Sequence, residues 1–244
     1  MILQDQPSCF PENVTVIVSC RGDGSVLRRV AGVHNPDFVA RRVAICKFAN
    51  VQYADTVFQR IIYDTARTYS LISEVDNGST TKFTEEVVAD ALYTTAKGVA
   101  LLLPVGDCAA TVVYDTARGA LALAHLGRHS TYAKLATRLV RHFLNDGSKP
   151  GDLTVWMSPH AQKVSYKLDW FDQAADPDWR GYYEQKADGI YLDIAGFNRH
   201  LMEQLGVLSQ NIHISAVDTM QNPNYFSHAA GDTSGRVAVV AVMR

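Results

Sequence analysis

The chain is poor in cysteine, and its cysteines do not lie close together in the sequence. Its 244 residues contain four cysteines, at positions 9, 20, 46 and 108, and no C-x-x-C motif. Cysteines spaced this far apart do not suggest a disulfide framework and are typical of a reducing compartment. The chain also begins without the basic and then apolar segment of a secretory signal peptide. We therefore expect a cytoplasmic location.

Long hydrophobic runs and an excess of one charge are also missing. No stretch approaches the roughly 18 apolar residues that a membrane-spanning helix requires. The 23 basic and 25 acidic residues give a net charge of −2, and the only basic doublets are Arg28-Arg29 and Arg41-Arg42. Binding to nucleic acid or to an anionic membrane needs a clustered basic surface, so we expect neither partner. The motifs G-x-G-x-x-G, Walker A and G-x-S-x-G are absent as well.

Short apolar runs with a few helices among them indicate an α+β fold with a mixed sheet. Strands are predicted at residues 13–19, 56–62, 69–75, 98–105, 109–114, 119–126, 153–157, 212–217 and 237–243. Helices are predicted at 36–48 (with Asn35 as cap), from 130 or 131 to 145, from Asp193 to about 206, and irregularly at 170–186. Because no linker or repeat is visible, we expect residues 1–244 to form one domain.

The most informative stretch runs from Val88 to Ser130. The turn at 115–119 predicts a hairpin between the strands at 109–114 and 119–126. Cys108 opens the first of these strands and His125 lies at the end of the second. Because a hairpin returns both far ends to one edge of the sheet, the Cys108 thiol and the His125 imidazole can lie opposite one another.

Such a pair allows two kinds of chemistry. Each of the two residues also has a purely structural explanation. Free cysteines are often simply buried, and a histidine at a sheet edge is often satisfied by the backbone. As a metal site, the pair is one ligand short of the three that a catalytic zinc requires. As a metal-free dyad, Cys108 would be the nucleophile and His125 its base, with Asp107 or a backbone carbonyl orienting the imidazole.

Other polar residues near this hairpin are candidates for substrate binding. Arg128 and His129 follow the second strand and could receive an anion, and Arg21 lies in a glycine-rich turn. His160 and His228 lie in predicted loops and could line a pocket, whereas His142 is expected on a helix surface. Each of these residues could equally be a solvated surface side chain.

An ordered series of motifs resembles the laccase-domain family, also called YfiH-like, polyphenol oxidase or purine nucleoside phosphorylase. The matching pieces, in chain order, are Ser19-Cys-Arg-Gly-Asp-Gly-Ser25, Ala89-Asp-Ala-Leu-Tyr-Thr94, Val105-Gly-Asp-Cys108, Ala124-His-Leu-Gly127, Asp193 to Asn198, and Tyr225-Phe-Ser227 with Gly235-Arg236. The resemblance covers nearly the whole chain.

The resemblance implies a mixed α/β sandwich of the kind shared with Cys-His toxin deamidases. It also implies a zinc ion held by two histidines and one cysteine, and phosphorolysis of purine nucleosides, often with adenosine deamination. Cys108 and His125 would be two of the ligands. Ser227 and His228, in the carboxyl-terminal motif, would contact the nucleoside or the phosphate.

The family's first histidine ligand has no counterpart here, since no histidine occurs between residues 35 and 124. The equivalent position falls near Tyr63 or Thr68, and Asp64, Asp76 or His228 could supply a third ligand. Three hypotheses follow: a zinc-dependent purine nucleoside phosphorylase or adenosine deaminase, a metal-free Cys-His hydrolase or deamidase, and a nucleoside-binding module without catalysis. The oligomeric state is not predicted.

Overall fold

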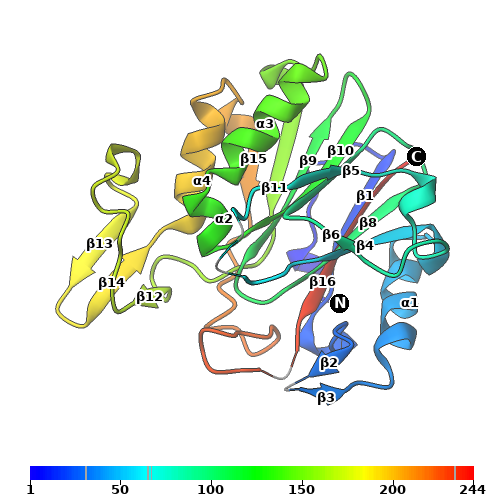
Figure 1. The fold of residues 1–244 in the computed structure, drawn as a ribbon, viewed down its shortest axis with the longest axis horizontal. Helices are drawn as coiled ribbons and strands as arrows, with labels where there is room; N and C mark the ends of the chain where they lie inside the picture. The colour runs from blue at the N-terminus through cyan, green and yellow to red at the C-terminus, as the bar shows by residue number, and fades with distance from the viewer. Residues whose placement is uncertain (31, 65, 67, 234) are drawn as a thin grey trace.

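The computed structural model describes residues 1–30, 32–64, 66, 68–233 and 235–244, and two mixed sheets dominate it (Figure 1). The first sheet has the order β1 (Val14–Val18), β16 (Val237–Met243), β8 (Ala100–Val105), β4 (Thr56–Arg60) and β6 (Val87–Val88). The second has the order β15 (Ile212–Ile214), β11 (Leu153–Met157), β9 (Ala109–Asp115), β10 (Ala120–Leu126), β7 (Ala91–Thr94) and β5 (Ile72–Glu74). Parallel pairs such as β4–β8 and β5–β7 occur beside antiparallel ones, so the predicted mixed α+β sandwich is confirmed.

The helices cover the outer faces of the two sheets (Figure 1). Helices α3 (Leu135–Asn145) and α4 (Ile194–Glu203) pack with the short α2 (Arg128–Tyr132) on the second sheet, and α1 (Phe38–Phe48) packs on the first. A second core fills the space between the sheets, where Val16, Leu103, Val112 and Trp156 are buried. Strands β9 and β10 are buried along their whole length, because one face meets the helices and the other meets the first sheet.

Residues 170–186 do not form the predicted irregular helix. They contain the 3₁₀ turn η6 (Pro177–Trp179) and end in β13 (Tyr183–Lys186), which joins β14 (Gly189–Leu192) and β12 (Lys167–Leu168) in a separate sheet. The aromatic residues anchor this segment to the rest of the fold. Trp179 is fully buried, with its ring stacked 3.8 Å from that of Phe197 on α4. The aromatic spacing therefore reflects long-range packing rather than a helical period.

The helix predicted from residue 130 or 131 to 145 is two helices. Lys134 adopts a left-handed conformation, with φ of +53°, between α2 and α3. Ser130 does not cap a helix from outside; it lies within α2, where its hydroxyl donates to the His125 carbonyl at 2.6 Å. The predicted helix at 36–48 begins at Phe38, and the Asn35 amide donates to the Ser25 and Leu27 carbonyls instead of capping it.

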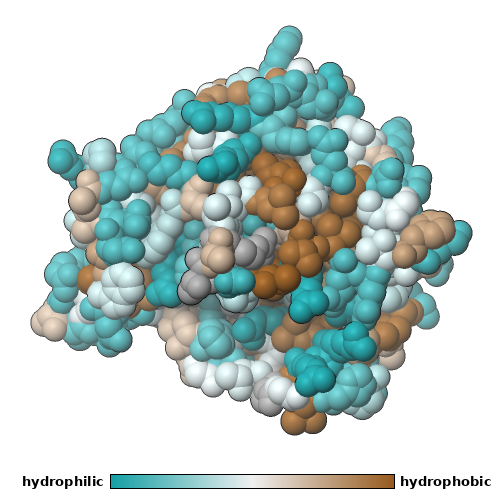
Figure 2. Space-filling model, in the orientation of Figure 1, coloured by the Kyte–Doolittle hydropathy of each residue, from teal (hydrophilic) through white to brown (hydrophobic). Residues whose placement is uncertain are grey.

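The remaining elements are short. They are the hairpin β2 (Arg29–Val30) with β3 (Val33–His34), and the 3₁₀ turns η1 (Leu3–Asp5), η2 (Arg21–Asp23), η3 (Tyr53–Asp55), η4 (Asn77–Ser79), η5 (Pro150–Asp152) and η7 (Ser209–Asn211). Across the described ranges, no helix has both the length and the apolar character needed to cross a membrane. Hydrophobic residues gather in a hollow near the centre of the face seen in Figure 2, and hydrophilic residues surround them.

Candidate functional site

The β9–β10 hairpin brings Cys108 and His125 together. In its register, Ala110 lies opposite His125 and Ala109 lies opposite Leu126, so Cys108 is next to Gly127. A Cβ atom built on Gly127 would lie 2.7 Å from the Cys108 sulfur and 3.1 Å from Cε1 of His125. Both side chains therefore converge on the space above Gly127, and only a residue without a side chain leaves that space open.

Backbone contacts hold the end of β10 in place. The His125 amide donates to the Asp90 carbonyl at 2.9 Å, and the Ser130 hydroxyl accepts from the Gly127 amide at 3.0 Å. The Asp90 carboxylate also accepts from the amide of Leu71, at 2.9 Å, at the end of the loop that carries Tyr63 and Tyr69. Asp90 thus links the histidine strand to that loop.

A pocket of about 550 Å³ opens over the pair, with aromatic rings along one side. The Tyr63 ring meets the His125 and His129 rings edge-on, with centroids 6.2 and 6.3 Å apart. The Tyr69 ring stacks on His129 at 4.7 Å. This volume and this mixture of aromatic and polar groups are typical of a site for a small molecule with a flat ring system.

Burial keeps both central groups neutral. Part of Cys108 is exposed at the pocket surface, but its thiol is surrounded by protein. Burial, helped by the Asp107 carboxylate, raises the pKa of this thiol to about 12. Burial also lowers the pKa of His125 to about 4, with smaller effects from His129 and Arg236. At neutral pH the site therefore holds a thiol and an uncharged imidazole rather than an ion pair.

Asp107 connects the pocket wall to two other loops. Its backbone is left-handed, with φ of +71°, and its carbonyl accepts from the Ala161 amide at 2.8 Å. One carboxylate oxygen accepts from the Thr219 hydroxyl and the other from the Ala229 amide, each at 2.7 Å. These contacts assign its carboxylate to loop positioning, and none of them reaches the imidazole that Asp107 was expected to orient.

The other predicted binding residues divide into two groups. Arg128, His129 and His228 line the pocket. Arg21 instead lies against the carboxyl-terminal loop, where it forms an ion pair of 2.5 Å with Asp232 and donates to the Tyr225 carbonyl. Ser227 is buried and accepts from the Ala230 amide at 3.1 Å. Neither contact brings Arg21 or Ser227 to the pocket.

Of the remaining two histidines that were considered, His160 lines a small cavity together with Cys108 and Arg128, whereas His142 packs against Tyr93. His160 is buried and hydrogen-bonds the Ser158 carbonyl through Nδ1 at 2.8 Å. His142 is half-buried, with its ring edge-on to Tyr93 at 4.5 Å. It is therefore less exposed than the predicted surface position.

The zinc hypothesis requires a third ligand beside Cys108 and His125. In the part of the chain that the structure describes, no three His, Cys, Asp or Glu side chains gather in a group that could hold a metal ion. The Asp64 carboxylate accepts from the Ala66 amide. The Asp76 carboxylate caps the turn η4, which follows β5, by accepting from the Gly78 amide. His228 lines the pocket without completing a ligand set. Cys108 and His125 alone do not fit a three-ligand zinc, so zinc stays an expectation from the resemblance.

Several pocket residues were not singled out from the sequence. Tyr69 and Tyr166 line the pocket and were not among the predicted site residues. Arg236 also lines the pocket, and its place in the carboxyl-terminal motif could have indicated it. Gly127 and Asp90 likewise lie within quoted motifs, but their roles depend on contacts between distant segments.

Comparisons with known proteins agree with this architecture. Purine nucleoside phosphorylase YlmD of Bacillus subtilis is 25% identical over 202 residues, covering 79% of this chain and 72% of that protein. Purine nucleoside phosphorylase of Deinococcus radiodurans is 28% identical over 159 residues, covering 64% of this chain and 62% of that protein. The aligned part thus falls short of two thirds of the second relative.

Solved structures share the fold. The crystal structure of YlmD from Geobacillus stearothermophilus superposes with a TM-score of 0.82 at 21% identity, covering 98% of this chain and 94% of that one. The Bacillus licheniformis hypothetical protein YfiH superposes with a TM-score of 0.81 at 20% identity, covering 95% and 93%. Residues 36–244 match one family over most of the chain. The chain belongs to the family described as multi-copper polyphenol oxidoreductase laccase.

Proposed function

We propose that the pocket over Cys108 and His125 binds a purine nucleoside and supports its cleavage by phosphate. The observation that carries this proposal is the group of Tyr63, Tyr69 and His129 rings beside the Cys108–His125 pair in one pocket. Burial, which raises the pKa of Cys108 and lowers that of His125, favours the neutral forms of both groups. Aromatic rings suit a flat purine base, because base–aromatic stacking is favourable and does not depend on charge. The names of the relatives support the same substrate class.

The reaction needs a base site, a phosphate site and a route for one proton. A phosphate oxygen attacks C1′ of the ribose, and the bond from C1′ to the purine nitrogen breaks with both electrons leaving on the purine. The proton that monohydrogen phosphate loses is the one that the purine gains, so the products are the free base and ribose 1-phosphate. A neutral imidazole can accept a proton on one nitrogen and donate from the other, which is the role we assign to His125.

Arg128 and Arg236 line the pocket and are the groups that we assign to the attacking phosphate. Their fixed positive charge favours an anion. One guanidinium group can also donate two parallel hydrogen bonds to two oxygens of a phosphate. No step in this scheme is assigned to zinc. A zinc-dependent form of the reaction would require a ligand beyond Cys108 and His125.

The metal-free hydrolase or deamidase hypothesis needs a Cys108 thiolate. Burial raises the pKa of that thiol to about 12, which works against the thiolate at neutral pH. The third hypothesis, nucleoside binding without catalysis, uses the same pocket. It requires only the aromatic and polar groups that line this pocket.

Product analysis tests the proposal. The purified chain is incubated with inosine, guanosine or adenosine and phosphate, and free base, ribose 1-phosphate and ammonia are measured, with nucleoside binding followed by calorimetry. We expect phosphate-dependent base release that His125→Ala abolishes and that His213→Ala, at an exposed position on β15, leaves unchanged. Binding without release would favour the non-catalytic module. Absence of both binding and release would overturn the proposal.

A further inference from the structure

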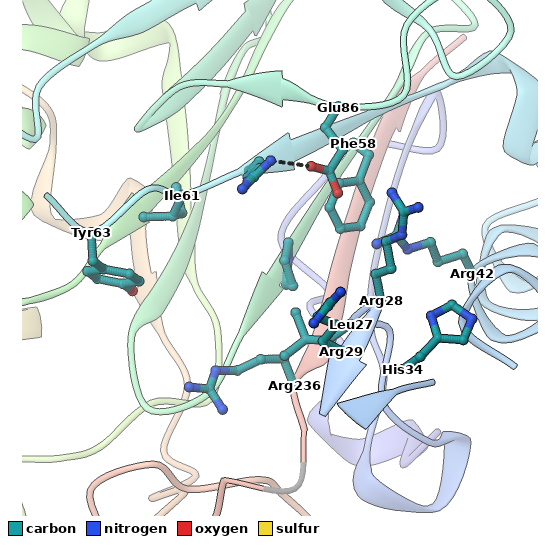
Figure 3. Close-up of a pocket in the computed structure, with 12 residues that line it drawn as sticks. Leu27, Arg28, Arg29, His34, Arg42, Phe58, Ile61, Tyr63, Glu86 and Arg236 are labelled. Atoms are coloured by element: carbon teal, nitrogen blue, oxygen red, sulfur yellow. Dashed lines mark hydrogen bonds and ion pairs between the residues drawn. The ribbon is translucent and has the colours of Figure 1, made fainter. Parts of the chain in front are cut away.

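A second cavity, of about 570 Å³, adjoins the Cys108–His125 pocket and is lined by arginine (Figure 3). It lies among the β2–β3 hairpin, α1 and β4. Its arginines come from four separate parts of the chain: Arg28, Arg29, Arg42, Arg60 and Arg236. We call this space the arginine cavity.

Arg42 gives the strongest indication of an anion site, because it is buried, with only 1% of its surface exposed. Its guanidinium lies over the Phe58 ring at 3.4 Å, and it donates to the Val26 carbonyl at 2.9 Å and to the Tyr53 hydroxyl at 3.0 Å. Among the described residues, no carboxylate lies within ion-pair distance of it. A buried charge without a counter-ion is unfavourable, so an anion in the cavity would stabilise it.

The other charges around the cavity leave it strongly positive. Arg28 pairs with Glu85 at 2.6 Å, and Arg60 pairs with Glu86 at 3.2 Å. Within the described residues, Arg29 and Arg236 have no carboxylate in ion-pair range. Five arginines therefore face two glutamates, which leaves an excess of three positive charges.

The arginine cavity adjoins the Cys108–His125 pocket and shares three lining residues with it. Tyr63, Pro104 and Arg236 line both spaces. Figure 3 shows the Arg236 side chain extending from the start of β16 toward the side of the cavity where Tyr63 lies. A ligand that places a ring system beside Tyr63 can therefore extend a charged group past Arg236.

We propose that the arginine cavity binds the phosphate groups of a phosphorylated nucleoside whose base occupies the Cys108–His125 pocket. The inference rests on the proposed function for the position of the base, but its electrostatic basis is separate. Guanidinium groups bind phosphate oxygens in pairs. A cavity of this volume, with three unneutralised charges, suits a phosphate ester better than a single inorganic phosphate ion.

Calorimetry on the full chain tests the inference. Inosine, inosine 5′-monophosphate and inorganic phosphate are each titrated at low and high salt. We expect the monophosphate to bind at least about tenfold more tightly than inosine, and high salt to weaken the binding of the monophosphate but not that of inosine. Arg28→Ala with Arg29→Ala, at exposed positions, should reduce monophosphate affinity about tenfold more than inosine affinity. The charge-matched control is Arg138→Ala with Arg141→Ala, exposed on α3, which should change neither affinity.

The outcomes separate the two proposals. The arginine-cavity inference would be overturned if inosine and its monophosphate bound with equal affinity. It would also be overturned if the test and control variants lost equal monophosphate affinity. In both cases the proposed function would still stand. If inosine does not bind but the monophosphate does, with the expected loss in the test variant, the inference is supported and the proposed function fails. Tight binding of inorganic phosphate, with no gain for the monophosphate over inosine, would mean that the cavity serves a free phosphate and would overturn the inference.

Discussion

The hydroxyl of Tyr63 lies 3.4 Å from Nε2 of His125, in the pocket that Cys108 also lines. A phenol at this place occupies space beside the imidazole without supplying the histidine nitrogen that the family resemblance implies. The two residues are 62 apart in the sequence, and the loop ending at Leu71 brings them together.

Replacing Tyr63 by histidine is therefore expected to create a zinc site. A nitrogen near that position, with Cys108 and His125, would complete a His₂Cys set. Metal analysis of protein purified without chelator should find about one zinc per chain in Tyr63→His and much less in the unchanged protein. Phe83→His, at an exposed aromatic position, is the control. Full zinc occupancy of the unchanged protein would show that the pocket recruits a ligand we have not identified.

Substitution of Gly127 by alanine is expected to disturb the pocket. The new methyl group would lie 2.7 Å from the Cys108 sulfur, so the thiol or the end of β10 must move. We expect a loss of about 1–3 kcal/mol in the free energy of unfolding, as for other overpacked positions, and weaker nucleoside binding. Urea denaturation and calorimetry measure both effects. Gly151→Ala, where the nearest atom is 3.9 Å away, should leave both unchanged.

Alkylation of Cys108 is expected to be slow at neutral pH. Burial raises the pKa of its thiol to about 12, and only the thiolate reacts. The rate with iodoacetamide, followed for each cysteine by peptide mass spectrometry, should still be rising at pH 9. Cys9, whose pKa is raised to about 11, provides an internal comparison with a cysteine outside the pocket. Rapid modification of Cys108 below pH 8 would instead favour the metal-free Cys-His enzyme.

The buried His125 is expected to make the protein less stable in mild acid. Its pKa falls from 6.5 to about 4 on folding, so between these values the unfolded chain binds a proton that the folded chain excludes. The free energy of unfolding should therefore decrease as the pH falls through this window, by up to about 1.4 kcal/mol per pH unit for this group. Burial lowers the pKa of His160 too, which adds to the effect.

The contribution of His125 can be isolated by comparing slopes. In His125→Gln the free energy of unfolding should depend less steeply on pH between about 6.5 and 4 than in the unchanged protein. His213→Gln, at an exposed position, should keep the original slope. Identical slopes in all three proteins would indicate that the imidazole of His125 is accessible to protons in the folded state.

Local patterns were sufficient for part of the fold. The β9–β10 hairpin follows from two apolar runs and a turn, and its register alone brings Cys108 and His125 to one end. Helix α4 begins where Asp193 was expected to start it, and the Asp193 carboxylate accepts from the Gly196 amide at 2.7 Å. The segment at 170–186 was assigned wrongly, because Phe171, Trp179 and Tyr183 pack on one another and Trp179 packs on α4, without the regular spacing of a helix.

The amino-acid sequence by itself determined the class of fold and the meeting of Cys108 with His125, because turn chemistry and strand alternation act between near neighbours. The family followed from the resemblance of an ordered series of motifs. The tertiary structure alone decided that Tyr63 stands beside His125 and that Asp107 holds loops rather than the imidazole. It also decided that arginines as distant as Arg28 and Arg236 surround one cavity. Those relations depend on how separate loops pack over the sheet edges, and packing between distant segments leaves no periodic signal in the chain.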